Sequence, residues 1–478
     1  MVRFLIIIAG LCSLLMSCTK KPDITYQVLG AEPLKKVTLP DESSSSLIEW
    51  ARGGYRDMTV INVSPSDGMA FLPDEKIGTI KKLIREQKWD KLEKARDVGY
   101  KGLFDRSNYL YAAVRLGIVR KIYWVIPQRF FEYVDVERRV KNYLSAETSL
   151  FDQRDIDKMG LRGGCVSGSF YGAKLNICSP ETLPAITEPV LLDIGSDFFT
   201  VFSAGRQTGV LAGLKLFFDV MNGKSLRVVS ADVAFSERST FKKPFHSYIG
   251  YQVAEALKNP SIMQASDPPL LWRERDLLES FLAGGSPRDT VEAVDALSPQ
   301  HADETSLLTF KAVGLAFAGR TDASLRIFEE RLKKERGRIG VLVFVGKELA
   351  GAKKTGEAGR FFVKALEWDP VSPGALLGYA DMQYGQQAYL SALDLYEKAE
   401  ERVDSLYLQL RIGDCLYYLD RKDEAAAHYE KASAMFEEKI RFEMSGQNKG
   451  SLERMLELSA AGLMPKGASM ARLLLNSG

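Results

Sequence analysis

Short apolar runs alternate with amphipathic stretches between residues 47 and 262. The apolar runs are rich in β-branched residues, which predicts buried strands at residues 59–63, 121–126, 175–177, 190–194 and from 228 onward. The stretches between them predict helices, among them residues 74–93, 135–144 and 208–221. Buried strands separated by helices are typical of a parallel sheet covered on both faces, so this region is predicted to be a three-layer α/β domain.

After about residue 300 the apolar pattern has a helical period and repeats itself. A small residue, an aromatic residue four positions later and an alanine three positions after that recur at offsets of 34 and 33 residues. The three copies are Ala358, Phe362 and Ala365; Ala392, Tyr396 and Ala399; and Ala425, Tyr429 and Ala432. A weaker copy surrounds Phe328, and a degenerate helical pair is expected at residues 270–282 and 290–297.

This period and spacing resemble the tetratricopeptide repeat, so the fold class is α/β plus all-α, with a helical solenoid over residues 270–478. A capping segment is expected at residues 451–475. The resemblance implies a concave groove that binds a protein or peptide; the alternative is a stack that only shields or spaces the first domain. The aromatics that could line a groove, or could simply be packed, are Tyr379, Tyr384, Tyr407 and Tyr417.

The first 18 residues have the pattern of an export signal, with Arg3 ahead of an apolar run and small Ser17 before Cys18. Residues 15–18 resemble the lipobox of bacterial lipoproteins, which implies a signal peptide over residues 1–17 and a membrane anchor on the Cys18 thiol. An ordinary secretory peptide with a coincidental cysteine is the alternative. No aspartate follows Cys18, which implies the outer membrane, facing the periplasm. Residues 18–46 are polar and are expected to form a lipidated tether, or an edge strand followed by a linker.

Composition narrows the function classes. The 478 residues carry a formal net charge of +2, which gives no reason to expect nucleic-acid binding. Beyond the leader and Cys18, three cysteines remain: Cys165, Cys178 and Cys415. An oxidising compartment permits a bond between Cys165 and Cys178, while two buried thiols are an equal alternative. Cys415 is expected in the core of a helical repeat.

The predicted strand ends resemble a known family. Ligands of parallel sheets bind beyond the carboxyl ends of the strands, at residues 64–68, 128–129 and 195–199 here. Residues 62–69 resemble a motif that reads Asp-Ala-His-Asp-Asp in relatives, and residues 192–199 resemble one that reads Asp-Ile-Asp-Leu-Asp-Tyr-Phe. With residues 122–127 between them, these motifs resemble an uncharacterised family related to the arginase/deacetylase fold, over residues 47–257.

The departures from that family bear on catalysis. Serines 64 and 66 stand where Asp and His are expected, and Gly195 replaces the central Asp of the second motif. The resemblance leaves three remnant metal or ligand residues: Asp67, Asp193 and Asp197. Catalytic divalent ions generally need three good protein ligands, and serine hydroxyls are poor substitutes. Of the three histidines, only His246 is placed to contribute, because His301 and His428 belong to the helical part.

The sequence therefore predicts an envelope lipoprotein that binds proteins through its helical repeats. Its arginase-like domain, residues 47–262, is expected to be non-catalytic, with no metal and no cofactor. The alternative is a metal-dependent hydrolase of C–N bonds that uses the three remnant aspartates. The metal content of the purified protein and the side chains at the strand ends distinguish these hypotheses.

Overall fold

The computed structural model describes residues 24–96, 102–127, 129–147, 153–235, 243–301, 304–335, 337–403 and 405–435. The expected signal peptide, the candidate lipidation site Cys18 and the expected cap at residues 451–475 lie outside these ranges. Within them, no helix is long and apolar enough to cross a membrane.

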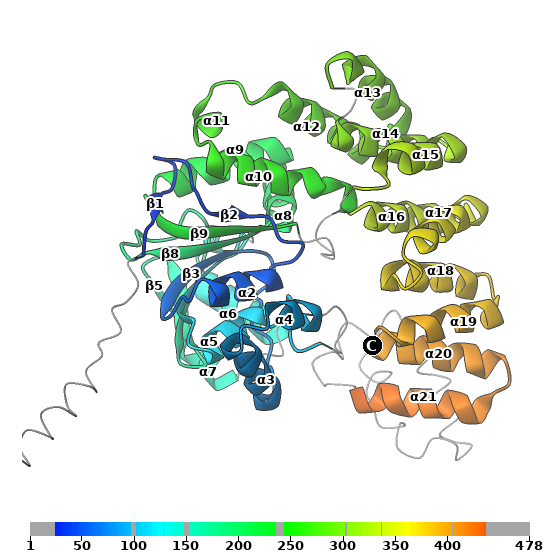
Figure 1. Ribbon diagram of the computed structural model, residues 1–478, viewed down its shortest axis with the longest axis horizontal. Helices are drawn as coiled ribbons and strands as arrows, with labels where there is room; N and C mark the ends of the chain where they lie inside the picture. Colours follow the sequence, from blue (N-terminus) through cyan, green and yellow to red (C-terminus); the bar gives the residue numbers. More distant parts are fainter. Residues whose placement is uncertain are drawn as a thin grey trace, which may run out of the picture.

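A mixed sheet forms the centre of the N-terminal part (Figure 1). Its strand order is β1-β9-β8-β3-β4-β7-β6-β5, and β2 pairs with β9. The strands are β1 (Gln27–Val28), β2 (Val37–Thr38), β3 (Met58–Val63), β4 (Val119–Val125), β5 (Gly160–Arg162), β6 (Cys165–Phe170), β7 (Ala173–Cys178), β8 (Val190–Gly195) and β9 (Arg227–Ala234). Every residue of β3 and β8 is buried, which explains why these strands show no polar alternation.

All five predicted strands are confirmed, but the sheet is not purely parallel. Strands β2, β3, β4, β7, β8 and β9 pair in parallel, whereas β5, β6 and β1 run antiparallel to their neighbours. The β6–β7 connection is a tight hairpin at Tyr171 and Gly172, both of which have positive φ. No helix fits into so short a connection, so these strands pair antiparallel.

Helices cover both faces of the sheet, with α2 to α5 below and α9 and α10 above in Figure 1. One face carries α2 (Ser44–Arg52), α3 (Asp74–Arg85), α4 (Trp89–Ala95), α5 (Tyr109–Arg115), α6 (Val136–Glu147) and α7 (Gln153–Lys158). The other carries α8 (Asp197–Arg206), α9 (Val210–Asn222), α10 (Tyr248–Lys258) and α11 (Ser261–Gln264). The short helices η1 (Arg129–Glu132) and η2 (Pro244–Ser247) join these elements.

Two expectations for this part do not hold. The helix expected at residues 74–93 is two helices, because Gln87 adopts a positive φ of 52° between α3 and α4. A linker was the expectation for the serine run, but Ser44, Ser45 and Ser46 are buried in the first turn of α2. Upstream of them β1 is an edge strand of the sheet, as one of the two expectations for this segment has it, and β2 also pairs with β9. Residues 24–46 therefore belong to the folded domain.

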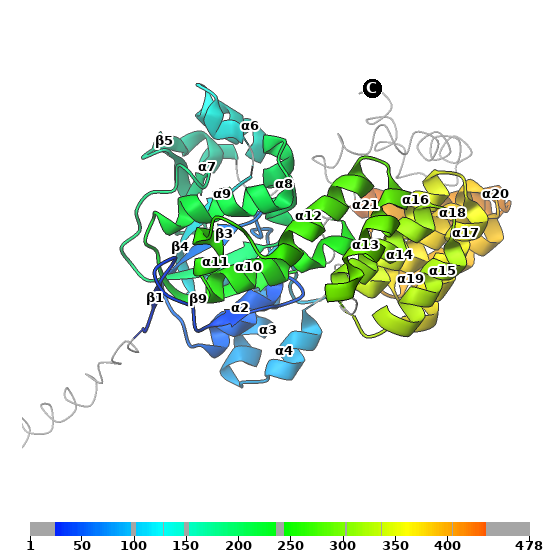
Figure 2. The same ribbon diagram turned by 90° about the horizontal axis from the view of Figure 1, so that it is seen from above.

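Pairs of helices form an arm beside the sheet (Figures 1 and 2). They are α12 (Leu270–Ala283), α13 (Pro287–His301), α14 (Thr305–Phe317), α15 (Thr321–Ile327) with the π-helical η3 (Phe328–Leu332), α16 (Arg338–Gly351), α17 (Thr355–Trp368), α18 (Pro373–Gly385), α19 (Tyr389–Glu400), α20 (Leu406–Tyr418) and α21 (Lys422–Met435). The predicted helical character after residue 270 is confirmed for the described residues, which end at Met435.

Small residues let the paired helices approach closely. A Cβ added to Gly378 would lie 2.7 Å from the Phe362 ring, and one added to Gly413 would lie 2.6 Å from the Tyr429 ring. Both rings are fully buried and belong to the repeated aromatic position. Each aromatic therefore fills the space that a glycine on a neighbouring helix leaves.

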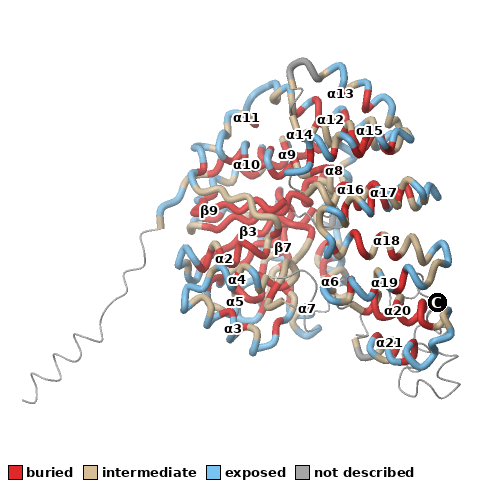
Figure 3. Tube along the Cα trace, turned by 45° about the vertical axis from the view of Figure 1, so that its right-hand side comes forward, coloured by how far each residue is buried: buried red, intermediate tan, exposed pale blue. Residues whose placement is uncertain are grey.

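The arm and the sheet share a hydrophobic core. Phe245 in η2 lies 5.5 Å from both Phe310 in α14 and Phe344 in α16, measured between ring centroids. One buried cluster runs from Leu29 on the sheet side to Ala375 in α18, whereas α19 to α21 pack into a separate cluster. Figure 3 shows the strands and the inner faces of these helices as the buried regions. The first helices of the arm are thus built onto the α/β domain.

Candidate functional sites at the strand ends and on the arm

Three polar side chains form a row across the carboxyl half of the sheet. Asn62 on β3 is in register with Asp193 on β8, which is in register with Asp232 on β9. Residues paired in this way point to the same face, here the face covered by α2 and α5. Both aspartates have no exposed surface.

Hydrogen bonds inside the protein occupy both carboxylates. Asp193 accepts bonds from the Ser46 hydroxyl at 3.1 Å and the Tyr109 hydroxyl at 2.5 Å. Asp232 accepts bonds from the Thr38 hydroxyl and, at 2.7 Å, from the Trp50 indole nitrogen. Because Ser46 and Trp50 lie on α2 and Tyr109 begins α5, the aspartates tie these helices to the sheet.

Burial raises the pKa values of the two aspartates in this row. Loss of hydration and the nearby charge of Asp232 raise the pKa of Asp193 to about 8, against hydrogen bonds that lower it. Burial likewise raises the pKa of Asp232 to about 6. The raised pKa favours the protonated form of Asp193, which suits a structural hydrogen-bonding group better than a metal ligand.

The structure separates the other two predicted aspartates from these bonds. Asp67 lies in the loop after β3, where its Oδ1 accepts the Met69 amide at 2.9 Å, and burial raises its pKa to about 6. Asp197 begins α8 and lines a small pocket with Ser64, Ser66 and Tyr109. Tyr109 lines this pocket and also bonds to Asp193, so it links the two places.

Sequence reasoning missed Asp232 and the residues that bond to the row. Asp232 is a charged residue within the otherwise apolar second half of β9, and this isolation was the available signal. Tyr109, Trp50 and Thr38 gave no signal, because only the fold brings them to the strand ends.

Metal ligands do not gather in the described part of the chain. No group of three or more His, Cys, Asp or Glu side chains there could hold an ion. His246 lies in η2, where its Nε2 is 2.8 Å from Glu279 Oε1 on α12. Burial would raise the pKa of Glu279, but the nearby His246 and a hydrogen bond from the Tyr248 hydroxyl lower it overall. This histidine thus links the sheet domain to the arm.

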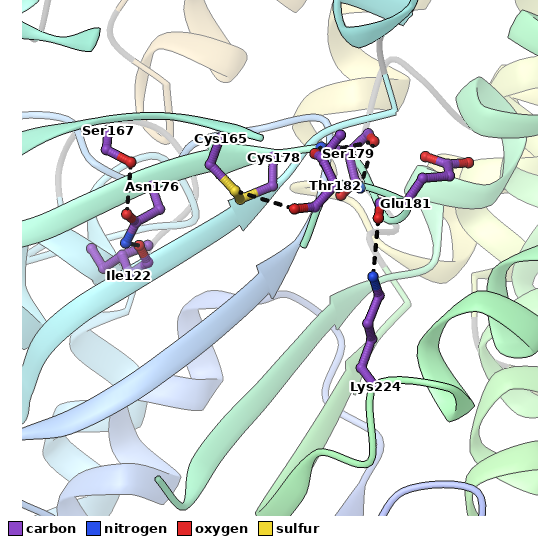
Figure 4. Close-up of a disulfide and its surroundings, with 9 residues drawn as sticks. All are labelled: Ile122, Cys165, Ser167, Asn176, Cys178, Ser179, Glu181, Thr182 and Lys224. Atoms are coloured by element: carbon purple, nitrogen blue, oxygen red, sulfur yellow. Dashed lines mark hydrogen bonds between the residues drawn. A yellow bond between two sulfur atoms is a disulfide. The ribbon is translucent and has the colours of Figure 1, made fainter. Parts of the chain in front are cut away.

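A disulfide joins two neighbouring strands near the β5 edge of the sheet (Figure 4). It connects Cys165 on β6 with Cys178 on β7, which resolves the alternative that composition left open. Nearby, Ser167 donates to Asn176 Oδ1, and Asn176 donates to the Ile122 carbonyl. Cys415 is a buried free cysteine in α20, as expected for the helical part.

The four candidate groove tyrosines differ in the residues that they contact directly, and all four are half-buried. Tyr384 and Tyr407 share Arg411, whose guanidinium lies 5.0 and 5.1 Å from their ring centroids. Tyr379 stacks on Phe362 instead, and Tyr417 packs against Tyr418. Tyr384 and Tyr407 therefore share a surface with Arg411. Tyr417 reaches Tyr384 only indirectly, through the rings of Tyr418 and Tyr389.

A repeated polar contact supports that surface. The Tyr396 hydroxyl donates to Asp381 at 2.7 Å, and the Tyr429 hydroxyl donates to Asp414 at 2.6 Å, one repeat later. Tyr407 also donates to Asp381, at 2.7 Å, and Arg411 donates to Asp414 at 3.1 Å. The buried Asp414 and the half-buried Asp381 thus position the half-exposed aromatic and cationic groups.

Comparison with known proteins yields structural neighbours alone: no family model and no curated protein matches the chain. MamA (AMB-1) has 17% identity and a TM-score of 0.26, covering 34% of this chain and 90% of its own. MamA from Desulfovibrio magneticus RS-1 has 17% identity and a TM-score of 0.26 over 34% and 92% of the two chains. A further MamA crystal structure has 13% identity and a TM-score of 0.27 over 36% and 93%. Values this low carry no conclusion about function.

Proposed function

We propose that this chain is an envelope lipoprotein that binds another protein through a tetratricopeptide-like arm. Its α/β domain, which resembles the arginase-related family, serves as a non-catalytic base for that arm. A lipid on Cys18 holds the molecule at the outer membrane, facing the periplasm.

The observation that carries the binding proposal is the cluster of Tyr384, Tyr407 and Arg411 on the arm. Tyrosine and arginine are enriched among residues that dominate protein–protein binding energy. Here both ring systems and the guanidinium are half-buried and are held by Asp381 and Asp414. A preorganised surface loses little side-chain entropy on binding, which favours affinity.

The hydrogen bonds at the strand ends favour a structural role for the α/β domain. A metal-dependent hydrolase would need Asp193 ionised and released from Ser46 and Tyr109. We expect no equimolar Mn, Zn or Fe in the purified full chain by mass spectrometry. Equimolar metal that is lost in Asp193→Asn, with hydrolysis of a C–N bond, would instead establish the alternative.

The Cys165–Cys178 bond supports the proposed location, since disulfides persist in oxidising compartments such as the periplasm. The anchor is tested by fractionation: Cys18→Ala should move the protein from the membrane pellet to the soluble envelope fraction. Unchanged fractionation would contradict the lipid anchor and leave the binding proposal untouched.

Partner binding is tested by photo-crosslinking in intact cells. A photoreactive residue replaces Tyr418 on the arm, which is 46% exposed, or the control Tyr26 on the α/β domain, which is 40% exposed. We expect a discrete crosslinked species from position 418 alone, abolished by Tyr384→Ala combined with Tyr407→Ala. Crosslinks from position 26 alone, or a crosslink that survives the double substitution, would contradict the proposed surface.

A further inference from the structure

A basic cavity lies between α2, α3 and α4, which sit together below the sheet in Figure 1. Its volume is about 770 Å³. Gly54 and Arg56 line it just before β3, and Leu116 and Ile118 line it just before β4. The cavity therefore opens at the amino ends of the strands, away from the carboxylate row.

The charge of the cavity wall has one sign. Five cations line it and no carboxylate does; they are Arg52, Arg56, Lys81, Lys82 and Arg85. Arg52 pairs with Glu49 at 2.7 Å and lies over the Trp89 ring. Lys81, Lys82 and Arg85 are exposed and form no ion pair within the described residues.

Favourable helix dipoles explain only part of this charge. Arg52 and Arg85 end α2 and α3, where cations stabilise the helix C-terminus. Arg56 lies in a loop and Lys81 lies a turn earlier in α3, so neither has that role. Glu86 lies close enough for the charges of Lys82 and Arg85 to lower its pKa, but it does not line the cavity. The wall therefore keeps an excess of positive charge, which a bound anion would offset.

Two glycines keep the cavity open. Gly78 lies within α3, and a Cβ there would meet nothing within 4 Å. The same is true of Gly54, but its positive φ of 67° already favours glycine, so only Gly78 lacks a backbone reason. Glycine inside a helix destabilises it by about 0.5–1 kcal/mol relative to alanine, and no close packing at Gly78 accounts for that cost. The cavity thus combines free space at its wall with five cations and the indole of Trp89, which together suit the binding of a ligand.

We propose that this cavity binds a phosphate-bearing anion. Arginine forks and lysine ammonium groups are the usual protein partners of phosphate. Two sources share this chemistry: the headgroup of an anionic phospholipid and a soluble phosphate compound. The phospholipid source rests on the proposed lipid anchor, which would hold the domain beside a membrane surface that attracts basic residues.

The test measures tryptophan fluorescence of the full chain, because Trp89 lines the cavity. The probes are dihexanoyl phosphatidylglycerol below its micelle concentration, the zwitterionic dihexanoyl phosphatidylcholine, and inorganic pyrophosphate. The variants are Lys81→Gln with Lys82→Gln, Gly78→Met, which fills the cavity without changing its charge, and the control Lys91→Gln with Lys94→Gln. The control lysines are exposed on neighbouring α4 but outside the cavity wall.

We expect saturable binding that weakens at least tenfold in both cavity variants and less than twofold in the control. Binding of phosphatidylglycerol alone identifies a lipid headgroup, and binding of pyrophosphate identifies a soluble phosphate source. The proposal is overturned if neither anion binds, if phosphatidylcholine binds equally well, or if the control weakens binding as much as the cavity variants. The anchor itself is decided separately by the fractionation of Cys18→Ala.

Discussion

The strand ends and the arm use the same residue types in opposite ways. At the strand ends, Asp193 and Asp232 are fully buried and bond to Tyr109, Trp50 and other groups inside the domain. On the arm, Asp381 and Asp414 hold Tyr407 and Arg411, which remain half-exposed. This difference in exposure is the reason we propose a binding surface on the arm and a structural role for the polar row at the strand ends.

Among the tests of this comparison, we expect the largest loss of stability from Asp193→Ala. It leaves the buried hydroxyls of Ser46 and Tyr109 without an acceptor, so we expect the free energy of unfolding to fall by about 2–4 kcal/mol. Urea unfolding measures this. A change below 1 kcal/mol would contradict the structural role of the row.

Reduction of the Cys165–Cys178 bond should weaken the α/β domain by about 2–3 kcal/mol, because the bond closes a 13-residue separation. Thermal unfolding with and without dithiothreitol measures the loss. Cys415→Ser is the control for the arm, and it should leave the response to reductant unchanged. Equal melting with and without reductant would count against the bond.

The proton on Asp193 predicts a pH dependence of stability. Its pKa rises from 3.8 to about 8 on folding, so the native state holds a proton that the unfolded chain releases as pH rises. The stabilisation that this proton gives the folded state is complete below pH 3.8 and is lost as pH rises to about 8. The free energy of unfolding falls over this range by up to about 1.4 kcal/mol per pH unit. Asp193→Asn should lack it, so the variant should gain stability relative to the unsubstituted chain between pH 5 and 8. A constant difference would show that Asp193 is ionised.

The substitution Gly413→Ala tests the close packing between helices of the arm. Its new methyl group would lie 2.6 Å from the Tyr429 ring. We expect a loss of about 1–2 kcal/mol in thermal unfolding, because the fully buried ring must move. Gly356→Ala in α17 is the matched control, with nothing within 4 Å of its Cβ. Equal effects of the two substitutions would argue against the repeated glycine–aromatic contact.

The smallest effect concerns Tyr407→Phe, which removes one hydrogen bond to Asp381 while Tyr396 continues to donate to it. We expect a loss of about 0.5–1 kcal/mol in stability. Partner crosslinking from position 418 should fall more strongly, because the ring loses its fixed position. Unchanged crosslinking would remove Tyr407 from the proposed surface.

Much of the fold could be predicted from periodicity. The strands around Val60, Ile122 and Val190 were predicted correctly because each is a buried apolar run. The two helices around Gln87 could not be separated, since a single positive φ ended one of them. The buried serines of α2 were misleading as well: Ser46 is polar, yet its hydroxyl bonds to Asp193, which is 147 residues away in the chain.

The candidate sites were predicted less well. Asp193 was selected as a remnant ligand and Tyr384 as a groove residue, but neither their partners nor their exposure could be read from the chain. Tyr379 and Tyr417 looked equivalent to Tyr407 at helical spacing, although the structure places them in different contacts.

By itself, the sequence determined the alternation of strands and helices, the helical repeat with its small and aromatic positions, and the residues available for chemistry. Those properties depend on neighbours within a few turns, where spacing alone sets which side chains share a face. Only the tertiary structure decided that Asp193 is sealed under α2, that His246 joins the domain to the arm, and that five cations surround one cavity. Burial and charge pairing arise between residues far apart in the chain, so they depend on how the elements pack.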